Sequence, residues 1–227
     1  MTQTSKTPGL PTPGLCLIAD ARDDAGWLAR CAEALDATSA ATLIVRAPDG
    51  AAIDAKAASA LVAMAQQKGV AALIQDDWRT ARTLAADGVH VTARADIDDA
   101  YRAARAGLDP GAIVGVDAGS SRHDAMMLGE AGADYVAFAR HGEDEDAEAD
   151  HVDLVVWWAQ LFVVPVVAFG IETAEQARRM AEARADFIAA PIPPEDDVSA
   201  WASGLRAALA SARDPAATEA AAPGATP

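Results

Sequence analysis

Acidic side chains in this chain recur directly after short apolar runs, where carboxylates could do chemistry. Four stand in that position: Asp20, Asp76, Asp77 and Asp117. One cation, Arg46, follows another such run. Carboxylate oxygens are ligands for hard cations such as Mg²⁺, and a guanidinium can anchor a phosphate or a carboxylate. These residues predict a cation or polar-ligand site. Loop capping, solvated charge and an ion pair between Arg46 and Asp20 or Asp76 are the alternatives.

The segment 71–91 shows which elements would position these groups. Its first four residues, AALI, are apolar and suit a parallel strand buried on both faces. Asp77 can cap a helix that begins at Trp78, and Asp87-Gly88 breaks that helix before a second strand. Such a βαβ unit predicts a right-handed crossover. It places Gln75-Asp76-Asp77 at a carboxyl strand end, where α/β folds hold their sites.

The same alternation recurs along the chain and predicts eight strand–helix units. We expect strands at 15–19, 42–45, 71–74, 89–91, 112–116, 135–139, 164–169 and 187–190. We expect helices at 25–37, 53–68, 78–86, 97–106, 122–131, 152–161, 174–183 and 198–212. Eight evenly spaced units favour a closed (β/α)₈ TIM barrel over a doubly wound sheet. The barrel would span 15–212, between a flexible arm at 1–14 and a disordered tail at 213–227.

Composition excludes several classes of partner. The formal net charge is −16, which argues against nucleic acid and anionic membrane surfaces. No apolar run approaches the roughly 20 residues of a membrane span, and the first residues lack a signal-peptide core. A cytoplasmic protein is expected. Both cysteines, Cys16 and Cys31, fall in apolar elements and are expected to be reduced core thiols.

Histidines and tryptophans offer further candidates. His90, inside an expected strand, is interpreted as a satisfied core histidine, with catalysis as the alternative. His141 and His151 bracket the acidic run 140–150, which we expect to be a mobile solvated loop, with metal binding as the alternative. Trp157, Trp158 and Phe162 would form a helix face packed on the barrel. The alternative is a subunit interface, which would make the protein a homodimer.

Three segments resemble one known family. LIQDDWRTARTLAADGVHV, AIVGVDAGSSRHDAMMLGEAGADYVAF and VPVVAFGIETAEQARRMAEARADFIAA are similar, in order and spacing, to segments of thiamine phosphate synthases and thiazole tautomerases. The resemblance implies a TIM barrel and a Mg²⁺-dependent transferase. In that reaction magnesium holds hydroxymethylpyrimidine diphosphate, pyrophosphate leaves, and the thiazole phosphate nitrogen attacks. The ligands it implies are small phosphate-bearing molecules.

The resemblance also assigns site positions, and several depart from the family pattern. The family's Gln-x-Arg-x-Lys after strand two retains only Arg46. Its Asn-Asp after strand three matches Gln75-Asp76, which makes Asp76 the candidate magnesium ligand. The second metal aspartate, in Gly-Gln-Glu-Asp, falls on Ala95 of Thr-Ala-Arg-Ala. Asp96 can replace it only after a one-residue slip.

The remaining loops depart as well. The serine after strand five is Asp117, and the tautomerases' histidine in that loop falls on Gly119. The Thr- and Lys-containing loop after strand six is replaced by the acidic run. The Gly-Gly pair after strand seven is reduced to Gly170, and the Ser-Ala pair after strand eight is lost around 191–193. Those last two loops bind phosphate through backbone N–H groups, which proline lacks.

Three functional hypotheses follow. The first is a diverged enzyme or binder in thiamine or thiazole phosphate metabolism; if active, it would be a Mg²⁺-dependent, pyrophosphate-releasing transferase. The second is a non-catalytic barrel acting as a binding or regulatory partner. The third is a barrel enzyme on a different small polar substrate. Arg46, Gln75, Asp117 and Gly170 are the candidate substrate-binding residues in the first case, with Asp76 and Asp96 as candidate metal ligands.

Overall fold

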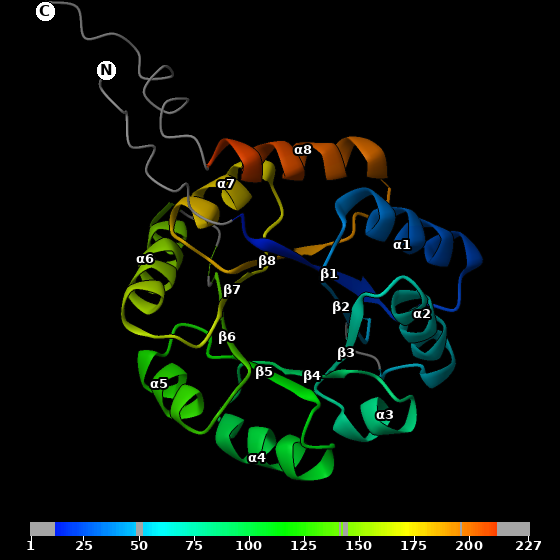
Figure 1. The fold of residues 1–227 in the computed structure, drawn as a ribbon, viewed down its shortest axis with the longest axis horizontal. Helices are drawn as coiled ribbons and strands as arrows, with labels where there is room; N and C mark the ends of the chain where they lie inside the picture. The colour runs from blue at the N-terminus through cyan, green and yellow to red at the C-terminus, as the bar shows by residue number, and fades with distance from the viewer. Residues whose placement is uncertain (1–11, 49–51, 141, 143–144, 196, 213–227) are drawn as a thin grey trace, which may run out of the picture.

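The computed structural model describes residues 12–48, 52–140, 142, 145–195 and 197–212. Within them eight parallel strands close into a barrel in the order β1 to β8, and Figure 1 shows the helices as an outer ring. The (β/α)₈ fold predicted from the sequence is therefore confirmed. The expected tail at 213–227 and residues 1–11 of the expected arm lie outside the described residues. The first strand begins at residue 14, one residue before the expected boundary.

The observed elements follow the expected ones closely. The strands are β1 (Gly14–Asp20), β2 (Thr42–Arg46), β3 (Ala71–Gln75), β4 (Gly88–Val91), β5 (Ile113–Asp117), β6 (Tyr135–Ala139), β7 (Val166–Phe169) and β8 (Phe187–Pro191). The helices are α1 (Ala25–Thr38), α2 (Ala55–Gln67), α3 (Trp78–Thr83), α4 (Ile97–Gly107), α5 (Arg122–Glu130), α6 (Glu145–Leu161), α7 (Ala174–Glu182) and α8 (Val198–Ser211).

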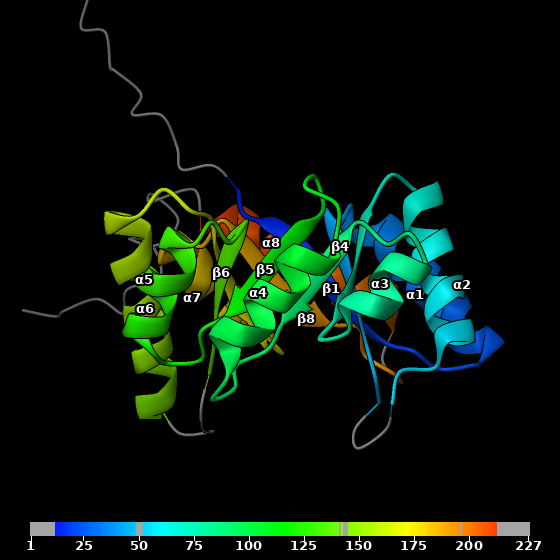
Figure 2. The ribbon, with the colours of Figure 1, turned by 90° about the horizontal axis from the view of Figure 1, so that it is seen from below.

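All strands except β4 contribute apolar side chains to two separate layers. In β1, Leu15 and Leu17 belong to the layer between strands and helices, whereas Cys16 and Ile18 belong to the barrel interior. This follows from the two-residue period of a strand. Figure 2 shows the helices standing outside the strands from the side. By the same period, Asp20 and Arg46 at the strand ends are in phase with the interior positions of β1 and β2.

Three aspartates at the helix-to-strand turns join neighbouring strands. Asp87 accepts a hydrogen bond from Ala72 N at 2.8 Å. Asp134 accepts one from Val114 N and Asp186 one from Val166 N, each at 2.8 Å. In each case the residue before one strand binds the amide at the start of the previous strand. An alanine precedes each of these aspartates, at 86–87, 133–134 and 185–186, so this repeated Ala-Asp turn joins neighbouring strands at the amino-terminal end of the barrel.

The acidic run after β6 is the main correction to the expected elements. The sequence predicted a loop at 140–150 and a helix from 152, but α6 begins at Glu145. Acidic residues suit the first turns of a helix because its N-terminal dipole is positive. Glu148 of this segment forms an ion pair with Arg179 of α7 at 3.0 Å. The predicted solvated loop is therefore wrong for residues 145–150.

The histidine that ends the acidic run is also not solvated. His151 is buried, and its Nε2 lies 2.7 Å from the carbonyl oxygen of Phe138. It therefore joins α6 to β6, because the helix turns this face toward the barrel. His141 lies outside the described residues, so the alternative of metal binding by the two histidines stays open.

The aromatic residues of α6 pack on the barrel as predicted. Trp158 is buried and donates its indole N–H to Val164 O at 2.8 Å. The ring of Phe162 stacks on it with centroids 4.0 Å apart. Both cysteines are free and buried, also as predicted, and burial raises the pKa of each to about 12. None of the described helices combines the length and apolar character needed to cross a membrane.

Gly115 of β5 provides a test of packing inside the barrel. A Cβ at this position would lie 1.9 Å from Cζ of Tyr135, so the tyrosine ring would have to move. We expect Gly115→Ala to lower the free energy of unfolding by about 1–3 kcal/mol, measured by urea denaturation. A Cβ added to Gly204 in α8 would have no atom within 4 Å. Gly204→Ala is thus the matched control and should stabilise the protein by about 1 kcal/mol. A Gly115→Ala variant as stable as the native chain would contradict this packing.

Candidate functional site

The candidate site lies at the carboxyl ends of β1 to β4, where several polar side chains meet. Strand register places Asp20 beside Arg46 and Gln75 beside His90. Because neighbouring strands in the barrel are also consecutive in sequence, these residues lie along one continuous sector of the rim. These residues therefore stand at the ends of neighbouring strands, and their role as one ligand site stays a prediction. The charges among them are, however, already paired.

The carboxylate of Asp20 forms ion pairs with two arginines, Arg46 and Arg22. It accepts a hydrogen bond from Arg46 Nε at 2.7 Å on one oxygen and pairs with Arg22 Nη2 through the other. Burial alone would raise the pKa of Asp20, but the hydrogen bonds from Arg46 and Arg22 outweigh it and lower the pKa below its ordinary value. The predicted alternative for Arg46, an ion pair with Asp20, is confirmed. Both terminal nitrogens of Arg46 have no protein partner in the described part of the chain.

Asp76 is bound by the turn that follows β4. Its carboxylate accepts hydrogen bonds from Thr92 N at 2.9 Å and Thr92 Oγ1 at 2.7 Å. Nη2 of Arg94 forms an ion pair with the same carboxylate. The backbone of Asp76 is left-handed, with φ of 61°, a conformation that aspartate tolerates better than most residues. Both carboxylate oxygens are therefore engaged by protein donors.

Asp77 and Asp96, the other candidate acids near Asp76, both stand at helix N-termini, but only Asp77 caps its helix. Asp77 caps α3, accepting from Arg79 N and Thr80 N at 3.0 Å each, so the capping alternative holds for it. Asp96 stands at the N-cap position of α4, but its side chain makes no capping hydrogen bond. It is not joined to Asp76 in any group of metal-ligating side chains among the described residues.

The residues present do not fit the magnesium site that the family pattern implies. Mg²⁺ requires near-octahedral oxygen coordination, normally with one or two carboxylates free to bind it. Here Asp76 is engaged by Thr92 and Arg94, and the second family aspartate is Ala95. No group of three His, Cys, Asp or Glu residues suited to a metal occurs in the described residues. A magnesium ion would therefore meet only one of the two family carboxylates, Asp76, and that carboxylate is already paired.

Asp117 and Gln75 differ in how far their hydrogen-bonding capacity is used. Asp117 is buried, and its Oδ1 accepts from Gly119 N at 2.8 Å, which shapes the turn after β5. Gln75 is partly buried, and its carboxamide has no partner within the described residues. Of these two candidates, only Gln75 has a side chain with all its hydrogen-bonding groups left for a ligand.

The loops after β7 and β8 have few amides to offer a phosphate. Gly170 has a left-handed φ of 72° and open space around it. The next amide, Ile171 N, donates to Ala189 O at 3.0 Å. After β8, Ile192 N donates to Ile18 O at 3.0 Å, and the residues on either side of it are prolines. Two amides of these loops are therefore used within the barrel, and the prolines have no N–H to give.

His90 is the centre of an aromatic stack inside the barrel, which the sequence did not reveal. Its ring lies 4.6 Å from that of Phe169 and 5.9 Å from that of Tyr135, nearly parallel to both. Its Nδ1 is 2.9 Å from the hydroxyl oxygen of Tyr135. The expected core histidine is confirmed as buried, although its Nε2 has no partner among the described residues. Burial lowers the pKa of His90 to about 4, although the negative charge of Asp76 acts to raise it.

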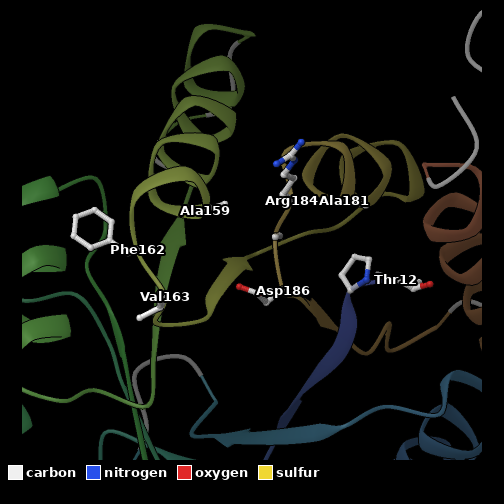
Figure 3. A pocket seen from close by; sticks show the side chains of 9 residues that line it. Thr12, Ala159, Phe162, Val163, Ala181, Arg184 and Asp186 are labelled. Atoms are coloured by element: carbon white, nitrogen blue, oxygen red, sulfur yellow. The ribbon is translucent and has the colours of Figure 1, made fainter. Parts of the chain in front are cut away.

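A separate cleft lies at the opposite end of the barrel. Figure 3 shows Thr12, Arg184 and Asp186 around it, with Phe162 and Val163 on the other side. Its volume is about 270 Å³. These residues precede strands, so the cleft is at the amino-terminal end and contains none of the candidate site residues. The carboxylate of Asp186 already accepts a hydrogen bond from Val166 N, which joins β7 to the turn before β8.

Fold and site together define a (β/α)₈ barrel protein with a polar rim at the carboxyl strand ends. Residues 15–191 match the family model described as "Thiamine monophosphate synthase". The chain belongs to this family, as its sequence segments indicated. The "Thiamine-phosphate synthase" of Erythrobacter litoralis is 37% identical over 160 residues, covering 68% of this chain and 71% of the relative. That of Rhodospirillum centenum is 39% identical over 164 residues, covering 70% and 77%.

Solved structures support the fold. A thiamine phosphate pyrophosphorylase from Pyrococcus furiosus superposes with a TM-score of 0.68 over 88% of this chain and 97% of that chain, at 21% identity. A Mycobacterium tuberculosis tryptophan synthase structure reaches a TM-score of 0.69 at 15% identity, covering 87% and 93%. Likenesses at these identities describe the shared barrel alone. The family assignment comes from the sequence matches.

The buried histidine leads to a prediction about pH. The folded pKa of His90, about 4, lies below the ordinary 6.5, so the unfolded chain binds a proton that the folded chain excludes. Stability should fall as the pH drops from 6.5 to 4, by roughly 3 kcal/mol from this residue, and the loss should level off below that window. Urea denaturation across that range should show a shallower decline for His90→Phe than for the native chain. His123→Phe, on the exposed face of α5, should retain the native slope. Identical slopes for all three would contradict the assignment.

Proposed function

We propose that this chain is a diverged cytoplasmic member of its family that binds a small phosphate-bearing ligand of thiamine metabolism without catalysing the magnesium-dependent synthase reaction. The observation that carries the proposal is the carboxylate of Asp76, which accepts from Thr92 and pairs with Arg94. The family pattern would leave this carboxylate free to hold the metal. Its engagement removes the group on which the diphosphate chemistry depends.

The synthase reaction needs strong stabilisation of a departing diphosphate. Metal ions and fixed cations supply it by neutralising charge as the bond to the leaving group breaks. In this chain the family's Gln-x-Arg-x-Lys cluster keeps only Arg46, whose two terminal nitrogens have no protein partner among the described residues. One guanidinium in place of that cluster, without a bound metal, gives weak electrostatic stabilisation to a departing pyrophosphate. This argues against turnover at the family's rate.

The loops after β7 and β8 support the same conclusion for the second substrate. In the family pattern they hold a phosphate through backbone amides. Here Ile171 N and Ile192 N donate within the barrel, and Pro191 and Pro193 have no N–H. A thiazole phosphate would find fewer donors at this end of the rim. Both phosphate-binding regions of the family site are therefore weakened together.

Two features support retained ligand binding over a purely structural barrel. Arg46 is fixed by Asp20 while its two terminal nitrogens point to no protein acceptor in the described residues. Gln75, on the adjacent strand, has an unpaired carboxamide. A partly buried amide without a protein partner loses hydrogen bonds to water, so its place at the rim suits a ligand that restores them. A guanidinium and a carboxamide together recognise a small anionic molecule.

A synthase assay tests the absence of turnover. With the full chain, both thiamine precursors and Mg²⁺, we expect no pyrophosphate release above a protein-free control, because Asp76 and its neighbours do not hold the metal. The Pyrococcus furiosus family member, assayed in parallel, checks the reagents. Magnesium-dependent turnover that is lost in Asp76→Asn would refute the proposal.

Ligand binding is tested separately with the same protein. The midpoint of thermal unfolding should rise with added thiazole phosphate or thiamine phosphate, since a ligand that binds only the folded state stabilises it. Arg46→Ala should remove most of this rise. Arg206→Ala, an exposed arginine of α8, is the matched control and should keep it. No rise with either compound would favour the alternative of a non-catalytic partner protein.

A further inference from the structure

We propose that Arg94 acts as a built-in cation at the barrel rim, so that the site binds its anionic ligand without a divalent metal. The inference rests on the proposed function only in taking the rim as the ligand site. Beyond the proposed function, Arg94 takes the place of the metal, and the ligand is a phosphate or diphosphate held directly by guanidinium groups. It also makes Arg94, which stands at the glutamate position of the family's Gly-Gln-Glu-Asp pattern, a ligand-binding residue.

The position of Arg94 is fixed by several contacts. Its Nε donates to Thr92 O at 3.3 Å, and its Nη2 lies 3.3 Å from Thr92 Oγ1. The same Nη2 pairs with Asp76. The side chain therefore folds back over the end of its own strand, and the guanidinium lies on the carboxylate. A cation in this place neutralises Asp76, which is the electrostatic role a bound metal would have.

Part of this guanidinium remains available to a ligand. Nη1 of Arg94 has no partner within the described residues, and the side chain is 34% exposed. A guanidinium has five N–H donors in a planar fork, and three bonds to the protein leave donors free. The fork matches the spacing of phosphate oxygens, which an ammonium group does not. The free side of Arg94 is thus suited to phosphate.

A second guanidinium lies across the end of β3. Strand β3 stands between β2, which ends at Arg46, and β4, which leads into Arg94. Gln75, at the end of β3, therefore lies between the two arginines. Arg46 is held by its Nε and has both terminal nitrogens free of partners within the described residues. Together these three side chains offer donors to a phosphate group placed over the end of β3.

The charge balance of this sector supports an anionic ligand. Three arginines (Arg22, Arg46 and Arg94) are paired with two aspartates, Asp20 and Asp76. These two ion-pair groups together carry one excess positive charge, three minus two, although the formal net charge of the chain is −16 and Asp77 and Asp96 stand close by. The terminal nitrogens left free on Arg46 and Arg94 suit a small anion that accepts hydrogen bonds from guanidinium groups. The ligand class is therefore a mono- or diphosphate, held directly by guanidinium groups.

The experiment measures binding of inorganic pyrophosphate to the full chain by calorimetry, once in EDTA and once in excess Mg²⁺. We expect the native chain to bind pyrophosphate in EDTA, without any need for Mg²⁺. Arg94→Ala should bind about tenfold more weakly in EDTA, from the loss of a charge-assisted hydrogen bond. Mg²⁺ should restore part of that loss, because Asp76 is then free to hold the metal.

Two further variants separate ligand binding from a structural role of Arg94. Arg94→Lys keeps the charge but not the fork, so its affinity in EDTA should lie between those of the native chain and Arg94→Ala. Arg102→Ala removes an arginine that pairs with Asp98 on the exposed face of α4, at 2.9 Å, and should bind as the native chain does. Circular dichroism and thermal unfolding confirm that each variant is folded.

Two results would overturn the inference. They are the absence of native binding in EDTA, with or without binding in Mg²⁺, and a folded Arg94→Ala variant whose affinity in EDTA is unchanged. Such a failure is distinguishable from failure of the proposed function. The proposed function fails if both precursors are turned over in the synthase assay, whereas magnesium-dependent binding without turnover would overturn only the role of Arg94.

Discussion

The closure of eight parallel strands into one ring is the constraint on which the rest of this structure depends. Closure leaves no free sheet edge among the described strands and brings every carboxyl strand end to the same rim. The two-residue period of a strand then decides which side chains face inward there. Asp20 and Arg46 meet across β1 and β2 for this reason alone, although they are 26 residues apart in sequence. The site is therefore a consequence of topology and register.

That topology also explains why the rim can change while the barrel persists. Most of the apolar burial lies between strands and helices, with a smaller cluster inside the barrel. Rim side chains such as Arg94 belong to neither layer, so replacing an acid with an arginine there costs little packing. Stability at the amino-terminal end is secured independently by Asp87, Asp134 and Asp186. Site and fold are thus built from different residues.

The sequence predicted the fold and most element boundaries because those depend on local patterns. Apolar runs, capping residues such as Asp77 and the repeated Ala-Asp turn each act within a few residues. The exception was α6, whose acidic first turns have the composition of a solvated loop. Its helical state depends on contacts with other elements, such as the ion pair to Arg179 and the burial of His151 against β6. Those contacts leave no periodic signal in the sequence.

The site was predictable only in part, for a related reason. Strand ends identified Asp20, Arg46, Gln75 and Asp76, and the alternative of an ion pair for Arg46 was already evident. The pairing of Asp76 with Arg94 depends on the shape of two turns and on the left-handed backbone of Asp76. Likewise, the bond between Tyr135 and His90 exists because Gly115, on the strand between them, leaves room for the tyrosine ring.

The left-handed backbone of Asp76 is stabilised by contacts that do not involve a metal, so its side chain can keep its place when the metal is lost. This conformation costs about 1 kcal/mol for a residue with a side chain, and it persists only where surrounding bonds compensate. At Asp76 the compensation comes from His90 O, which accepts the backbone N–H at 2.9 Å, and from Thr92. Both belong to β4 or the turn after it, and neither requires a metal. The carboxylate is therefore presented at the rim by the backbone itself, whichever cation neutralises it. An arginine two residues beyond Thr92 can take that role without any change to the strands.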